Sequence, residues 1–103
     1  MHLPNPWSAV PTERAARLDA ELQRELVRSH RLHGVDVHAV ATRDDCDDVL
    51  FLGASGDVFC VHLTWSAESS PAYPRTQAYR NLDEFAHRWP LEHSHEIFDD
   101  DAG

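Results

Sequence analysis

The segment from Asp47 to Ser66 constrains the fold more than any other part of the chain, because it predicts an apolar β-hairpin. Residues 49–52 (VLFL) form its first predicted strand, and residues 58–65 (VFCVHLTW) form its second. Between the strands lies GASGD, in which Gly56 can adopt the positive φ that a tight turn requires. We therefore expect the hydrophobic core to be built around this hairpin.

The pairing of the hairpin strands also predicts the distance between the two cysteines, Cys46 and Cys60. A turn centred on Ser55 and Gly56 pairs Cys60 with Phe51 and leaves Cys46 about 16 Å further along the ladder, at about 3.3 Å per residue. A disulfide requires Cα atoms within about 7 Å of each other. No disulfide is expected between them, which fits a reducing, cytoplasmic compartment.

A long amphipathic helix is predicted over residues 12–31, ahead of the hairpin. Thr12 is a favourable N-cap, and Gly34 can end the segment as a C-terminal cap residue. The apolar positions recur at steps of three and four residues: Ala15, Leu18, Leu22 and Leu26. So narrow a stripe is typical of a helix that packs one face on a sheet.

Two further strands are predicted beside the hairpin, over residues 35–42 and at the sheet edge over residues 75–80. The first of these is expected to place four side chains on one face: Val35, Val37, Ala39 and Ala41. The second hairpin strand has one apolar face, which should lie beneath the long helix: Phe59, Val61, Leu63 and Trp65. Its partner, residues 49–52, is apolar throughout, as is typical of a strand covered on both faces.

A second, short helix is predicted after residue 80. Asn81 can cap its first turn, with Glu84 reaching back in the manner of a capping box. Pro90 is expected to make Trp89 the last helical residue. Leu82, Phe85 and Trp89 share one face of this helix, which should therefore pack on the sheet.

These elements predict a single α+β domain over residues 1–103: an N-terminal helix, a three- or four-stranded antiparallel meander and a short C-terminal helix packed on the sheet. Residues 1–11 contain three prolines and should form an extended arm that Trp7 pins by burial. Residues 91–103 form an acidic tail that is expected to fray.

The formal net charge of −9 disfavours nucleic acid and anionic membranes as partners, because both require a cationic surface. No apolar run approaches the roughly 20 residues of a membrane span, and the N-terminus lacks the pattern of a secretory signal. A basic protein partner is compatible with this charge, and so is a homodimer formed through an exposed sheet edge.

Histidines form the first candidate site, because His93 and His95 lie two residues apart. With His62, or with His30 and His33, they could supply three nitrogens to zinc and leave a fourth position open for water. The chain contains neither HExxH nor CxxC. Solvated histidines on an acidic tail are the alternative interpretation.

Two weaker candidate sites lie in the hairpin and directly before it. Cys60 and His62 project from the same face of one strand and resemble a nucleophile with its base, although a buried structural cysteine is commoner. Four aspartates precede the first hairpin strand without the spacing of a calcium loop: Asp44, Asp45, Asp47 and Asp48. They are expected to cap turns, with Asp48 partly buried.

An aromatic and proline-rich region is the candidate protein-binding surface. It comprises Trp65, Pro71, Tyr73, Pro74 and Tyr79. The alternative is that Trp65 and Tyr79 belong to the core.

The runs CDDVLF (46–51), VHLTWS (61–66) and YPRTQAY (73–79) resemble a group of small bacterial proteins for which no function is established. The resemblance covers roughly residues 30 to 90 and implies a self-contained bacterial domain. It implies no activity, cofactor or partner.

The resulting hypothesis is a small non-enzymatic protein-interaction module without a cofactor, comparable in size and charge to immunity proteins and antitoxins. The alternative is a small metal-binding protein or metal-dependent hydrolase that uses His62, His93 and His95.

Overall fold

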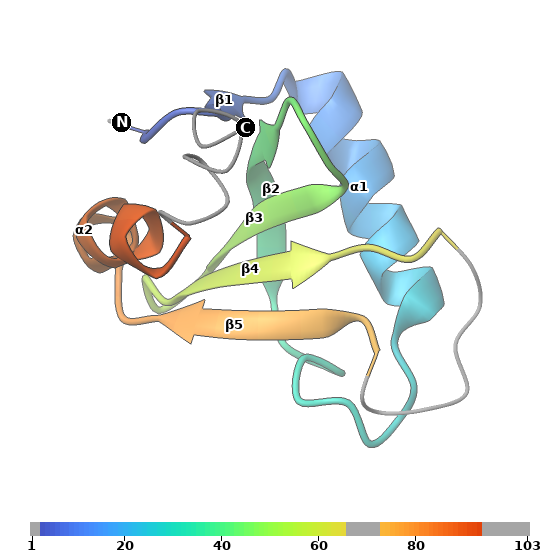
Figure 1. The fold of residues 1–103 in the computed structure, drawn as a ribbon. Helices are drawn as coiled ribbons and strands as arrows, with labels where there is room; N and C mark the ends of the chain where they lie inside the picture. Colours follow the sequence, from blue (N-terminus) through green and yellow to red (C-terminus); the bar gives the residue numbers. More distant parts are fainter. Residues whose placement is uncertain (1–2, 66–72, 94–103) are drawn as a thin grey trace.

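The computed structural model describes residues 3–65 and 73–93, which form one antiparallel sheet and two helices. In chain order the elements are β1 (Trp7–Ala9), α1 (Thr12–Glu25), β2 (Val37–Arg43), β3 (Asp48–Gly53), β4 (Val58–His62), β5 (Arg75–Tyr79) and α2 (Leu82–Glu92). Each strand pairs with the next one in sequence, so the sheet order is β1-β2-β3-β4-β5 (Figure 1). The predicted α+β class is confirmed, but the sheet has five strands instead of three or four.

The additional strand comes from the N-terminal arm. Trp7, Ser8 and Ala9 pair with the end of β2, and the Trp7 side chain is buried. A segment with three nearby prolines can add to a sheet only at its edge, where missing N–H donors are tolerated. The arm is therefore pinned by Trp7, as predicted, and it is also a strand.

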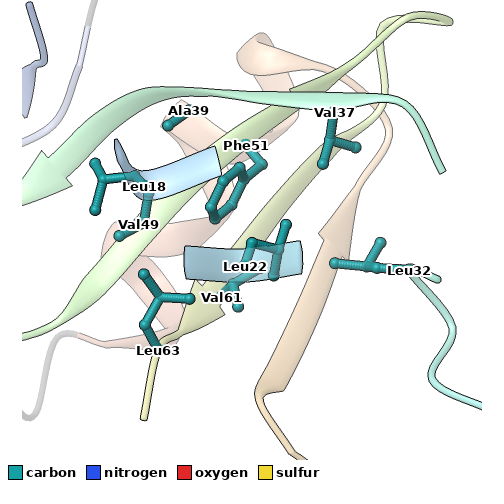
Figure 2. Packing of buried hydrophobic residues seen from close by; sticks show 9 residues of the cluster. All are labelled: Leu18, Leu22, Leu32, Val37, Ala39, Val49, Phe51, Val61 and Leu63. Atoms are coloured by element: carbon teal, nitrogen blue, oxygen red, sulfur yellow. The ribbon is translucent and has the colours of Figure 1, made fainter. Parts of the chain in front are cut away.

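Strand β3 lies at the centre of the sheet and contributes to two hydrophobic clusters. Its residues Val49 and Phe51 belong to the α1-side cluster, whose members are Leu18, Leu22, Leu32, Val37, Ala39, Val49, Phe51, Val61 and Leu63 (Figure 2). Its residue Leu50 belongs to the α2-side cluster of Trp7, Ala41, Leu50, Val58, Cys60, Tyr79, Phe85 and Trp89. The prediction that this strand is covered on both faces is confirmed.

A β-bulge at Val40 reverses the alternation of side chains along β2, so that residues on either side of the bulge point to opposite faces of the sheet. Ala39 pairs with Phe51, whereas Ala41 pairs with Leu50, so Val40 is an extra residue in the ladder. Ala39 therefore packs in the α1-side cluster and Ala41 in the α2-side cluster. The prediction of one common face for Val35, Val37, Ala39 and Ala41 was wrong because alternation assumes an unbroken ladder.

The hairpin turn is one residue longer than predicted. Gly53 N–H donates to Asp57 O at 2.8 Å, and Gly56 N–H donates to Gly53 O at 3.0 Å, with Gly56 at φ +98°. This geometry is a three-residue loop that ends in a residue with positive φ. Cys60 consequently pairs with Leu50 instead of Phe51. Neither cysteine forms a disulfide.

Both helices end at residues other than those predicted. α1 stops at Glu25 instead of residue 31, because Leu26 takes an extended backbone conformation and the chain turns so that Leu32 packs in the α1-side cluster. α2 begins with the predicted cap, since Glu84 N–H donates to the Asn81 side chain at 2.8 Å. It continues through Pro90 to Glu92, because His93 N–H still donates to Trp89 O at 3.0 Å.

The two helices lie on opposite faces of the sheet (Figure 1). α1 covers the face of Phe59, Val61 and Leu63, as predicted, but Trp65, which was expected on the same covered face, is exposed because the strand ends at His62. Within residues 3–65 and 73–93, neither helix has the length and apolar character that crossing a bilayer requires.

Candidate functional site

The register of three strands places polar side chains in a row across the sheet. Asp48 pairs with His62, and His62 pairs with Arg75. Directly paired residues project from the same face. Because Cys60 lies in the α2-side cluster and His62 is two residues further on, this row faces the α2 side of the sheet. The packed core under α2 reaches Cys60 but not this row.

A surface cleft lies over this row, beside the C-terminal end of α2. Its volume is about 540 Å³, and it is lined by Asp48, His62, Thr64, Tyr73, Arg75, Gln77 and His93. An adjoining hollow of about 260 Å³ adds Cys60 and Thr76 to the lining. We call these two volumes together the β4–β5 cleft.

His62 is oriented by the carboxylate across the ladder. Its Nδ1 lies 2.7 Å from Asp48 Oδ1, and Asp48 Oδ2 accepts a hydrogen bond from Arg43 at 3.3 Å. An ionised carboxylate only accepts, so Nδ1 carries the proton and Nε2 is left for a ligand. Asp48 is mostly buried, with 16 % of its side chain exposed, which agrees with the predicted partial burial.

His93 has the same tautomer for a different reason. Its Nδ1 lies 3.0 Å from Trp89 O, and a carbonyl oxygen can only accept a hydrogen bond. The imidazole also stacks on the Trp89 ring, with centroids 4.6 Å apart and planes 17° from parallel. Nε2 is therefore the nitrogen available to a ligand in both cleft histidines.

Arg75 supplies the permanent positive charge of the cleft. Its guanidinium lies 5.8 Å from the centroid of the Tyr73 ring, and it forms no ion pair with any residue that the structure describes. Gln77 donates to Glu92 at 3.0 Å, so its amide nitrogen already has an acceptor.

The structure brings together two of the three histidines of the predicted metal site. His62 and His93 line one cleft, whereas His95 lies outside the described residues. No group of three His, Cys, Asp or Glu side chains within the described ranges has the geometry to hold a metal ion.

His30, an alternative ligand in the sequence interpretation, is used for structure. It is buried, its Nε2 donates to Pro74 O at 2.8 Å, and its Nδ1 accepts from Leu32 N–H at 3.0 Å. Both ring nitrogens therefore have partners and neither is available to a metal. His33 is exposed in the turn that follows α1.

The aspartates before β3 surround a buried arginine. Arg43 donates to Asp45 at 2.8 and 2.9 Å and lies 4.9 Å from the Trp89 ring centroid. The hydrogen bond from Arg43 lowers the pKa of Asp45. Asp44 accepts from Ser8 at 3.5 Å, and the backbone oxygen of Asp47 accepts from Leu63 N–H. These residues close turns and neutralise Arg43.

The five residues of the predicted aromatic surface occupy different environments. Trp65 and Tyr73 are exposed, with 51 % and 39 % of their surface accessible. Pro74 and Tyr79 are buried, and Pro71 lies outside the described residues. Burial and a hydrogen bond to Glu92 raise the pKa of Tyr79, which donates to that carboxylate at 2.8 Å.

Trp65 is held in an unusual backbone conformation by a buried carboxylate. Its φ is +59°, a value that bulky residues rarely adopt. Glu25, at the end of α1, accepts from Trp65 N–H at 2.7 Å and from Thr64 N–H and Oγ1 at 2.8 and 3.0 Å. Burial, together with a hydrogen bond to Glu21, raises the pKa of Glu25. We call Glu25, Thr64 and Trp65 the Glu25 clasp.

The exposed Trp65 ring borders a groove beside the first turns of α1. The groove has a volume of about 450 Å³ and is lined by Pro11, Glu13, Arg14, Arg17, Leu18 and Trp65. Glu25 is a functional residue that the sequence motifs do not predict. The available signal was its position three residues after Leu22, on the apolar stripe of the helix, where a carboxylate must find buried donors.

Comparison with protein-family models, with curated proteins and with solved structures finds no match for this chain.

Proposed function

We propose that this chain is a small protein-interaction module whose contact surface is centred on Trp65. One observation carries the proposal: the fold keeps a tryptophan half-exposed at φ +59°, while a fully buried carboxylate fixes the backbone at that residue. A strained conformation costs about 1–3 kcal/mol and persists only where its surroundings impose it. Tryptophan is the residue type most enriched among binding hot spots.

The surroundings of Trp65 support an apolar contact with a charged rim. Pro11 and Leu18 line the groove beside the ring, and Glu13, Arg14 and Arg17 border it. This arrangement resembles protein interfaces, which combine an apolar centre with a polar edge. The net charge of −9 favours a basic partner, which long-range attraction would steer toward the module.

Affinity capture from a lysate of the source organism tests the proposal. Wild-type protein and the Trp65→Ala variant are used as bait at about 50 mM and about 500 mM salt, on either side of physiological screening. We expect one partner to be retained by the wild type, more weakly at high salt, and its affinity for Trp65→Ala to be reduced at least thirtyfold, the loss typical of a hot spot. Tyr73→Ala, which removes a second exposed aromatic ring of the described residues, is the matched control and should bind normally. Equal capture by Trp65→Ala and wild type would refute the proposal.

A metal-binding protein or metal-dependent hydrolase is the competing proposal. Its support is the shared cleft of His62 and His93, whose Nδ1 atoms each donate to an acceptor, as is usual for metal-ligating histidines. It requires a third ligand, for which the sequence offers His95. Elemental analysis of untagged protein tests it: about one zinc per chain is the expected result, and its absence together with no thermal shift on adding zinc would reject it.

A further inference from the structure

We propose that the β4–β5 cleft binds the oxyanion group of a small molecule, a phosphate or a carboxylate, through Arg75, His62 and His93. This inference is independent of the interaction surface at Trp65, because Trp65 does not line the cleft. Within the described residues, the carboxylates near the cleft have partners, whereas the Arg75 guanidinium has no ion-pair partner.

Among the residues that the structure describes, the acidic groups near the cleft, Asp48 and Glu92, are already paired with partners within the protein. Asp48 is held by Arg43 and His62, at 3.3 and 2.7 Å. Glu92, which lies beyond Gln77, accepts from Tyr79 at 2.8 Å and forms an ion pair with Arg88 at 2.8 Å.

Arg75 has no corresponding partner among the described residues, although the chain carries a net charge of −9. The Tyr73 ring lies beside its guanidinium and so restricts its position. A planar guanidinium with several N–H donors matches the geometry of a carboxylate or phosphate.

The two histidines extend the donor set. Since Nδ1 of each ring donates to a fixed acceptor, each imidazole offers Nε2 to a ligand and donates from that atom in its protonated form. The same two nitrogens could bind a metal in the neutral form. The fixed positive charge of Arg75 in the same cleft opposes a divalent cation and favours an anion.

The size of the cleft sets the class of ligand. A volume of about 540 Å³ falls within the range of small-molecule sites, roughly 300–1,000 Å³. Tyr73 provides an aromatic face beside the cation, so a ligand that joins a ring to its anionic group fits the lining.

Nuclear magnetic resonance titration with two probes tests the inference. Inorganic phosphate and acetate are added separately at constant ionic strength, maintained with chloride, and the ring signals of His62 and His93 are followed. We expect both histidines to shift together and saturably with at least one probe. The tighter probe identifies the group as phosphate or carboxylate.

Arg75→Gln should weaken that binding at least tenfold, because it removes the charge-assisted hydrogen bonds. Arg31→Gln, which changes an exposed arginine in the turn after α1, is the matched control and should stay within twofold of wild type. Circular dichroism confirms that both variants are folded.

Three results would overturn the inference. They are the absence of a saturable shift with either anion, an unchanged affinity in Arg75→Gln, and a shift of both histidines at one equivalent of zinc where the anions have no effect. The last result would assign the cleft to a metal. A failure here leaves the proposal for Trp65 intact, since that proposal is tested with a different variant and a different partner.

Discussion

Two buried polar side chains determine the path of the chain after α1. Glu25 accepts three hydrogen bonds from residues that follow β4, and His30 links Leu32 to Pro74 just before β5. Each connects segments that are more than thirty positions apart in the sequence. A buried polar group left without such partners costs about 1–3 kcal/mol, so these contacts specify one arrangement against others.

Replacing Glu25 should be among the most destabilising single changes away from the hydrophobic core. Glu25→Ala removes the carboxylate that accepts from two backbone N–H groups and one hydroxyl, and it opens a cavity beside α1. We expect a loss of about 2–4 kcal/mol in the free energy of unfolding, measured by urea denaturation. Glu13→Ala, an exposed carboxylate in the first turn of the same helix, should cost no more than about 1 kcal/mol. Similar losses in the two variants would show that the Glu25 clasp contributes little.

At the scale of elements, the hairpin depends on one glycine. Gly56 has φ +98°, and a Cβ placed there would meet no atom within 4 Å, so a substitution acts only through the backbone. Gly56→Ala should lower the free energy of unfolding by about 1–2 kcal/mol, the cost of a left-handed conformation for an L-residue. The neighbouring Ser55→Ala should stay within about 0.5 kcal/mol of wild type. Equal stability of Gly56→Ala and wild type in a urea titration would contradict this assignment of the turn.

The helices and strands differ in how much of their structure the sequence predicts. The apolar run 49–52, the stripe of α1 and the cap at Asn81 are local patterns, and all three were recognised. The bulge at Val40 and the early end of α1 depend on contacts across the sheet, which no short window of sequence contains. For these features tertiary packing overrides local preference.

In the candidate sites too, the sequence predicts what depends on local pattern and does not predict what depends on tertiary contacts. His62 and Cys60 were placed on one face from the alternation of a strand alone. The contributions of Arg75 and Asp48 required the register of three strands, which the predicted turn misplaced by one residue. The exposure of Trp65 depends on Glu25, whose partners lie about 40 residues away in the sequence.

At the scale of the whole molecule, the two hydrophobic clusters share the three middle strands of the sheet, β2, β3 and β4. Val49 and Phe51 pack toward α1, whereas Leu50 packs toward α2, so neither cluster can lose β3 without exposing the other. We expect one cooperative unfolding transition. Far-UV circular dichroism, dominated by the helices, and fluorescence, to which Trp7 and Trp89 of the α2-side cluster contribute, should give the same urea midpoint. Two separate midpoints would show that the clusters unfold independently.

The simple order of the sheet has a consequence for the rate of folding. Because every strand pairs with its neighbour in sequence, the β3–β4 hairpin can form first from residues only a short loop apart. β2 and β5 can then each add to an edge that already exists. Closing a short loop costs less chain entropy than closing a long one, and domains with local pairings fold faster than those that join distant strands. The strand order thus lets the sheet grow outward from the segment that is most apolar in sequence.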